Sequence, residues 1–75
     1  MLRYIPVQEE CFSPEIGPYR SFGIAAVRIA GGEEERLAYV ADVSPDREMV
    51  AQLATSCTTA QLDPVHLIEV VLDAL

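Results

Sequence analysis

The last eleven residues of the chain, VHLIEVVLDAL, contain only three polar side chains, and this pattern constrains the fold more than any other. At about 100° per residue, His66, Glu69 and Asp73 lie within about 60° of one another on a helical wheel. The other eight residues are apolar, whereas a surface helix needs an apolar stripe only somewhat wider than ~100°. The segment therefore predicts a largely buried helix with one narrow polar stripe in water.

Two interpretations of the polar stripe compete. In the first, His66, Glu69 and Asp73 are weak candidates for catalysis or metal binding, because a histidine and carboxylates at helical spacing can share a ligand, as in HExxH. That motif needs a second histidine, and this chain contains only one. In the second interpretation, which we favour, the three residues are the solvated edge of the helix, with His66 and Glu69 in contact at i, i+3. We therefore predict no metal, no cofactor and no catalytic residue here.

The apolar arc of the same helix predicts association with another chain. A 75-residue protein buries only about 60% of its unfolded surface, so it has little material with which to cover a helix that is apolar nearly all round. Exposed apolar patches commonly mark interaction sites, and two-fold homodimers are the commonest small assemblies. We expect a homodimer whose interface includes Leu67, Ile68, Val71, Leu72 and Leu75.

The first half of the chain has the patterns of strands. LRYIPV, residues 2–7, predicts a first strand, and Pro6 places it at a sheet edge because proline donates no hydrogen bond to a neighbouring strand. Two prolines and a glycine predict a loop over Phe12–Pro18. Strands over residues 19–29 and 36–43 then form a β-hairpin.

The turn of that hairpin is GGEEE, residues 31–35, in which two glycines permit positive φ and three acids keep the tip in water. Hard cations also bind carboxylates, but consecutive acids on a turn are typical of a solvated tip. Gly23 inside the strand 19–29 indicates a bulge or a close backbone approach.

Two helices follow, each introduced by a capping residue and a proline. Ser44 is the expected N-cap of a helix over residues 45–57, and Asp63 that of a helix over residues 64–75. The first helix is one-sided, and its apolar positions are Met49, Val50, Leu53, Ala54 and Cys57. Strands followed by helices predict a single α+β domain, a three-stranded antiparallel sheet with a C-terminal helical hairpin packed on one face.

Charge and cysteine content exclude several classes of protein. Twelve acids stand against five arginines, a net charge of −7, which argues against nucleic acid and against an anionic membrane surface. Cys11 and Cys57 are too few for a disulfide framework or a zinc finger. No export signal and no apolar run of ~18 residues is present, so we expect a cytoplasmic protein.

Three segments together resemble a family of short, uncharacterised bacterial proteins: YRSFGI (19–24), ADVSPDREMV (41–50) and LDPVHLIEVVLDAL (62–75). Its members share an aromatic-Gly-Ile strand, a D-[IV]-S helix start and a terminal L-x-P-x-H-L-x-[DE]-V helix. This chain carries Ala74 where an aromatic residue is usual. The resemblance implies the same element boundaries but no activity.

The leading functional hypothesis is therefore a non-enzymatic, self-associating protein-interaction module that uses the terminal helix, with the exposed sheet face as a further surface. One alternative is a small metal-dependent or acid–base enzyme that uses His66 and Glu69, with Asp42 or Asp73 as a further group. Another is an acidic subunit that binds a basic protein through its negative surface.

Overall fold

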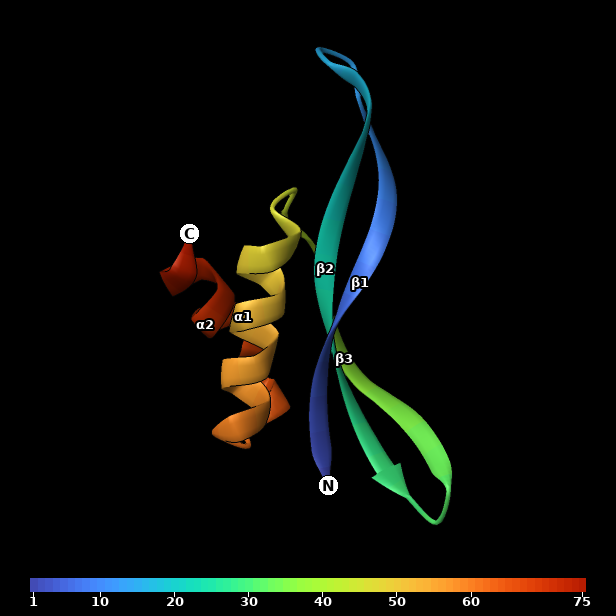
Figure 1. The fold of residues 1–75 in the computed structure, drawn as a ribbon, viewed down its shortest axis with the longest axis vertical. Coiled ribbons are helices and arrows are strands. Elements are labelled where there is room, and N and C mark those ends of the chain that lie inside the picture. Colours follow the sequence, from blue (N-terminus) through green and yellow to red (C-terminus); the bar gives the residue numbers. More distant parts are fainter.

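The computed structural model describes residues 1–75 as three strands followed by two helices (Figure 1). The strands form one antiparallel sheet in the order β1-β2-β3, so the first strand lies at an edge, as Pro6 predicts. The α+β architecture expected from the sequence is confirmed. The elements are β1 (Leu2–Ser13), β2 (Gly17–Ala30), β3 (Glu33–Ser44), α1 (Arg47–Thr59), a 3₁₀ turn η1 (Pro64–His66) and α2 (Leu67–Ala74).

The first hairpin is longer than the sequence predicts. The predicted loop over Phe12–Pro18 is shorter in the structure: only residues 14–16 form a turn, and β1 and β2 stay paired until Ser13 meets Gly17, which has a φ of +81°. Pro14 lies in this turn, whereas Pro18 pairs with Phe12, so cross-strand pairing overrides the loop preference of Pro18 alone. Since β3 pairs with β2 only from Phe22 onward, the end of this hairpin is a two-stranded ribbon that projects beyond the sheet (Figure 1).

Both helices lie on the same side of the sheet, and α2 runs back alongside α1 (Figure 1). One parity of β2, represented by Phe22, Ile24 and Ala26, points into the core between the sheet and the helices. Its central members Ile24 and Ala26 are fully buried. The remaining core residues are Tyr4, Val43, Val50, Ala54, Cys57, Leu67 and Val71.

The start of α1 differs from the prediction. The carboxylate of Asp46 accepts from the backbone N–H groups of Glu48 and Met49, which makes Asp46 the N-cap. Ser44 remains the last residue of β3, and its hydroxyl accepts from the Asp46 N–H instead. The helix therefore begins at Arg47 and not at Pro45, because Ser44 is held by strand pairing and Asp46 is the next side chain able to cap.

The second cap lies where the sequence places it. Asp63 accepts from the Val65 N–H at 3.1 Å, and Pro64 takes the first helical position. The first turn, however, is the 3₁₀ turn η1, and α2 begins only at Leu67. The last turn of α1 also extends to Thr59, past the predicted end at residue 57.

That last turn continues because its polar side chains bind the edge of β1. Thr58 Oγ1 accepts from the Tyr4 N–H at 2.8 Å, and the Gln61 side-chain amide both donates to the Leu2 carbonyl and accepts from its N–H. Pro6, two residues further on, has no N–H to leave unpaired. Side chains at and just after the end of α1 thus occupy the backbone hydrogen-bonding groups at the start of this edge strand. Without them, those groups could pair with a strand of another chain.

Candidate functional site

The residues expected to form a dimer interface divide into two sets. Leu67 and Val71 are only 1% and 2% exposed, because positions four apart on α2 share the side that packs on the sheet. Ile68 and Leu72, one position further along the helix, are 49% and 64% exposed. Leu75 is exposed as well, so an interface on this helix uses the second set and not Leu67 or Val71.

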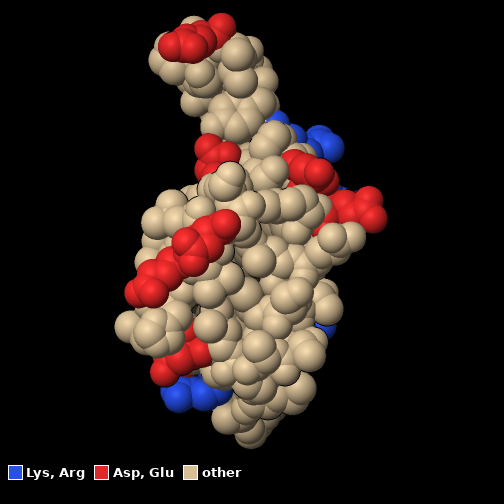
Figure 2. Space-filling view, turned by 90° about the vertical axis from the view of Figure 1, so that its left-hand side faces the viewer, with Lys and Arg blue, Asp and Glu red and all other residues tan.

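The exposed set belongs to a surface with few charges. Between residues 49 and 75 the only charged residues are Asp63, Glu69 and Asp73, and there is no Lys or Arg. Figure 2, which faces the helical side, shows a band of acidic residues across the left half of this face, more acidic residues near the hairpin, and an uncharged area to the right of the band. We use the name α2 surface for the four exposed apolar residues of η1, α2 and the C-terminus: Val65, Ile68, Leu72 and Leu75.

A small apolar pocket of about 150 Å³ lies between α1 and α2, and no residue of the α2 surface lines it. Its walls are almost entirely carbon, and the residues that line it are Leu53, Ser56, Cys57, Ala60, Leu62 and Val70. Burial raises the pKa of the Cys57 thiol, so this cysteine stays protonated and behaves as an apolar side chain.

The polar stripe of the terminal helix lies in water. His66 Nδ1 and Glu69 Oε1 are 3.8 Å apart, with both side chains more than half exposed, and Asp73 makes no ion pair. The predicted i, i+3 contact is therefore present, but it is longer than a hydrogen bond. No group of three or more His, Cys, Asp or Glu side chains is placed to hold a metal ion.

A second polar group lies on the opposite face of the sheet and is centred on Asp42. Two extra residues of β3 fit between the pairs Phe22–Ser44 and Ile24–Val40, and Asp42 has a φ of +50° within this bulge. Its carboxylate accepts from the Tyr19 hydroxyl at 2.7 Å and from the Ser21 hydroxyl at 2.5 Å. Its N–H donates to Glu9 Oε1 at 2.9 Å, so the network joins all three strands.

The electrostatics of this network show which proton positions are fixed. Hydrogen bonds from Ser21 and then Tyr19 hold the pKa of Asp42 below its usual value. The hydrogen bond to Asp42 raises the pKa of Tyr19 to about 12. At neutral pH the Asp42 carboxylate is therefore ionised and accepts hydrogen bonds, and the Tyr19 phenol is protonated and donates one. The hydrogen bonds that cause both shifts join the three strands.

Cys11 lies beside this network on β1 and pairs across the ribbon with Tyr19. Burial, and then the negative charge of Asp42, raise the pKa of its thiol. A raised pKa keeps the sulfur protonated and makes it a poor nucleophile. The structure therefore offers no activated thiol on either side of the sheet.

The bulge that carries Asp42 is partnered by a glycine. A Cβ built on Gly23 would lie 2.5 Å from the carbonyl oxygen of Val40 and 2.9 Å from the Tyr39 hydroxyl. The close backbone approach predicted at Gly23 is confirmed. Of the network itself, the sequence singled out only Asp42, as a further group for an enzyme. Tyr19, Ser21 and Glu9 were missed, because only the strand register brings them together.

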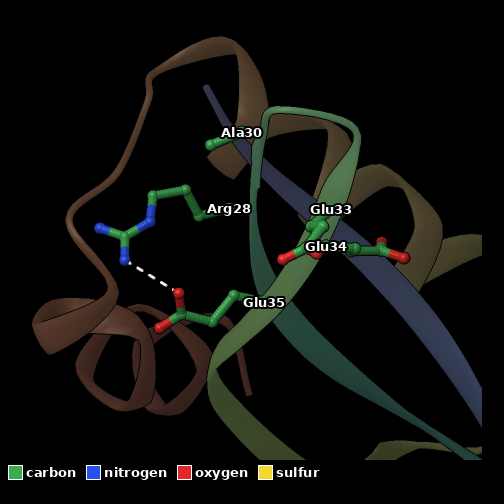
Figure 3. A pocket seen from close by; sticks show the side chains of 5 residues that line it. All are labelled: Arg28, Ala30, Glu33, Glu34 and Glu35. Carbon is green, nitrogen blue, oxygen red and sulfur yellow. Dashed lines mark hydrogen bonds and ion pairs between the residues drawn. The ribbon is translucent and has the colours of Figure 1, made fainter.

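The acidic turn forms a shallow hollow at the end of the second hairpin (Figure 3). Arg28 Nη2 lies 3.0 Å from Glu35 Oε2, and Glu34 points away from this pair. The turn itself is Gly31–Gly32, and the three acids begin β3. All three are exposed, so their charges are solvated and partly neutralised by one arginine.

The geometry defines a small α+β domain with one sheet face covered by helices and the other open. The chain belongs to the family of unknown function DUF6514, whose model matches residues 1–75. No match was found among curated proteins or solved structures. Neither helix has the length and apolar character needed to cross a membrane.

Proposed function

We propose that this protein is a non-enzymatic, cytoplasmic interaction module that self-associates through the α2 surface. The observation that carries the proposal is the exposure of four large apolar side chains within one short C-terminal segment. Val65 and Leu75 are about 70% exposed, and Leu72 is nearly as open. Aliphatic side chains this exposed, side by side on a helix, gain free energy when another apolar surface removes them from water.

The charge distribution supports a second copy as the occupant. Two chains of net charge −7 repel one another, and the repulsion is smallest where each surface lacks charge. The α2 surface comes nearest to that property, since its four residues are uncharged, whereas Glu69 and Asp73 lie on a separate stripe of the same helix. Interface cores in general are depleted of charged residues, which fits this side of the molecule better than the acidic turn.

The test is to place charge on the α2 surface. In the variant Ile68→Glu/Leu72→Glu, both substituted side chains are exposed in the single chain, so the fold is retained while association would bury two carboxylates. We expect the solution mass, measured by light scattering or sedimentation, to fall to half that of the wild type.

The matched control is Gln52→Glu/Thr55→Glu, which adds the same charge to exposed positions of α1. Its mass should equal that of the wild type, and circular dichroism should show the same helix content in all three proteins. An unchanged mass in the α2 variant would contradict the proposal. So would a wild type that sediments at 8.2 kDa at every concentration.

A further inference from the structure

The open face of the sheet has an ordered arrangement of charge that the α2 surface lacks. The strand register places Arg3, Val27 and Arg36 in one row across β1, β2 and β3. Glu9 and Ser21 form a row at the other end, and Asp42 joins them through its hydrogen bonds. One end of this face is therefore cationic and the other anionic.

The two arginines of the cationic row have no carboxylate partner within the chain. Arg20 and Arg28 lie on the opposite parity of β2 and are each paired with a glutamate. Arg36 instead lies over the ring of Tyr39, 5.0 Å from its centroid. Arg3 and Arg36 are therefore free to pair with carboxylates of another chain.

Between the charged rows the open face is apolar. Ile5, Ala25 and Tyr39 form the central row, and Val7 pairs with Gly23 in the next. Ala25 is fully buried between its cross-strand neighbours, although it is not part of the core under the helices. Small residues along the central strand and larger ones on either side make a surface that another sheet can approach closely.

The charged positions are related by symmetry. On β1, Arg3 and Glu9 lie three residues on either side of Pro6. On β3, Arg36 and Asp42 lie three residues on either side of Tyr39. Pro6 and Tyr39 lie in adjacent rows of the sheet, so a two-fold axis that lies parallel to the sheet and crosses the strands between these rows exchanges the two ends of the face.

We propose that a second copy of the chain packs on this open face, sheet against sheet, about that two-fold axis. β1 then lies over the partner's β1 in the reverse direction, which brings Arg3 opposite the partner's Glu9. Arg36 comes opposite the partner's Asp42 in the same way. Sheets pack about 10 Å apart, a distance that arginine and glutamate side chains extending toward each other can span. Tyr39 lies near the axis, where aromatic residues contribute most to an interface.

A second copy fits this face better than a basic protein. The face carries two positive and two negative side chains, so a uniformly basic partner meets the arginine row as well as the carboxylates. Only a surface with the same two rows in reverse order satisfies both ends at once, and the chain itself carries that surface.

This inference does not depend on the α2 surface, because the helices and the open face lie on opposite sides of the sheet. If both surfaces associate, the wild type forms an assembly larger than a dimer. The experiment therefore starts from the Ile68→Glu/Leu72→Glu variant, in which only the open face is left intact. We expect this variant to sediment at about twice 8.2 kDa.

Charge reversal on that background tests the contact between rows. Adding Arg3→Glu/Arg36→Glu leaves four carboxylates on each face, so we expect the dimer dissociation constant to rise at least about tenfold and monomer to dominate. Arg20→Glu/Arg28→Glu is the matched control: the same change in net charge on the other parity of β2, with no expected effect on the dimer. Ile5→Glu, which places a charge in the central row, should also give monomer.

The outcomes separate the two proposals. A monomeric Ile68→Glu/Leu72→Glu variant with the open face intact would overturn the sheet-to-sheet inference and leave the α2 surface standing. A wild type and an α2 variant of equal dimeric mass, both dissociated by Arg3→Glu/Arg36→Glu, would support the open face and overturn the α2 proposal. Equal weakening by the Arg20→Glu/Arg28→Glu control would show general repulsion and would also overturn the inference.

Discussion

The two faces of the sheet use the same three strands, yet their side chains are removed from water in different ways. On the covered face, Ile24 and Ala26 are buried because α1 and α2 lie over them. On the open face, Ala25 and Val27 are 0% and 3% exposed although no second layer covers them. Their neighbours on β1 and β3 shield them, since directly opposite side chains in a sheet are only about 5 Å apart.

The difference teaches that a buried residue on a central strand does not by itself indicate a layer above it. Small side chains such as Ser21 and Ala25 lose their exposure to flanking strands, while the larger neighbours Tyr39 and Ile5 keep part of theirs. The covered face depends on aliphatic packing across layers. The open face depends on hydrogen bonds and charge arranged within one layer, and mutations should affect the two faces differently.

The largest effect is expected on the covered face. Leu67→Ala should lower the free energy of unfolding by about 2–5 kcal/mol, because it leaves a cavity where α2 meets the sheet. Leu72→Ala, the same substitution one turn away on the exposed side of α2, should cost at most about 0.5 kcal/mol. Urea denaturation of both variants, at a protein concentration low enough to keep them monomeric, measures the difference. Similar losses at the two positions would mean that α2 is not oriented as the structure shows.

An intermediate effect is expected at Gly23, which belongs to the open face. Gly23→Ala should lower the free energy of unfolding by about 1–3 kcal/mol, because the new methyl group would collide with the Val40 carbonyl. Combining it with Tyr39→Phe removes the nearby hydroxyl but not this backbone oxygen, so we expect no recovery in denaturant titrations. If the double variant regained the wild-type free energy of unfolding, the Tyr39 side chain, and not the backbone of the β3 bulge, would be what excludes a larger residue at position 23.

The smallest effect is a change in titration within the open-face network. The pKa of Tyr19, about 12, should fall toward the usual 10.0 in Asp42→Asn, because the amide no longer favours the protonated phenol. The absorbance of the phenolate during an alkaline titration measures this shift, and Tyr19→Phe identifies the signal. Because the pKa values of Tyr4 and Tyr39 are raised as well, the test is whether the signal that Tyr19→Phe removes moves in Asp42→Asn, and an unmoved signal would disprove the assignment.

The same shifts fix the sign of the pH dependence. The pKa of Tyr19 is raised on folding, so its stabilising contribution is full below pH 10 and is lost as the pH rises toward 12. The pKa of Asp42 is lowered on folding, so its contribution is present above the usual value of 3.8 and is lost as the pH falls through the folded value. When the free energy of unfolding is measured by denaturation across pH, Asp42→Asn should show a smaller loss of stability at both the alkaline and the acidic end.

Much of the fold follows from local signals in the sequence. Two glycines locate the second turn, Asp63 and Pro64 start the last helix, and Pro6 marks an edge strand. These signals act through the backbone of one to four residues, so no distant partner is needed to interpret them. The prediction of Ser44 as the N-cap was wrong because a distant residue decides its position: Ser44 pairs with Phe22, and this pairing keeps it in β3.

The candidate sites were harder to predict, because each depends on which residues become neighbours. The periodicity of the last helix indicated too much apolar surface, but not which side the sheet would cover, so Leu67 and Val71 were grouped with Ile68 and Leu72. The hydrogen-bond network around Asp42 on the open face could not be predicted either, because it too depends on which residues become neighbours. Glu9, Tyr19 and Asp42 are far apart in the chain and meet only through a register that includes a bulge of two residues.

The sequence by itself determined the number and order of the elements, the capped start of the last helix and a terminal segment with more apolar side chains than one contact can bury. Those features arise from backbone preferences and from the spacing of residues along one helix or strand. Only the tertiary structure decided which face of the sheet the helices cover and where the charges of the open face lie. Between Ser21 and Val27 both parities of β2 are small or apolar, so neither side was favoured until packing and strand register selected one.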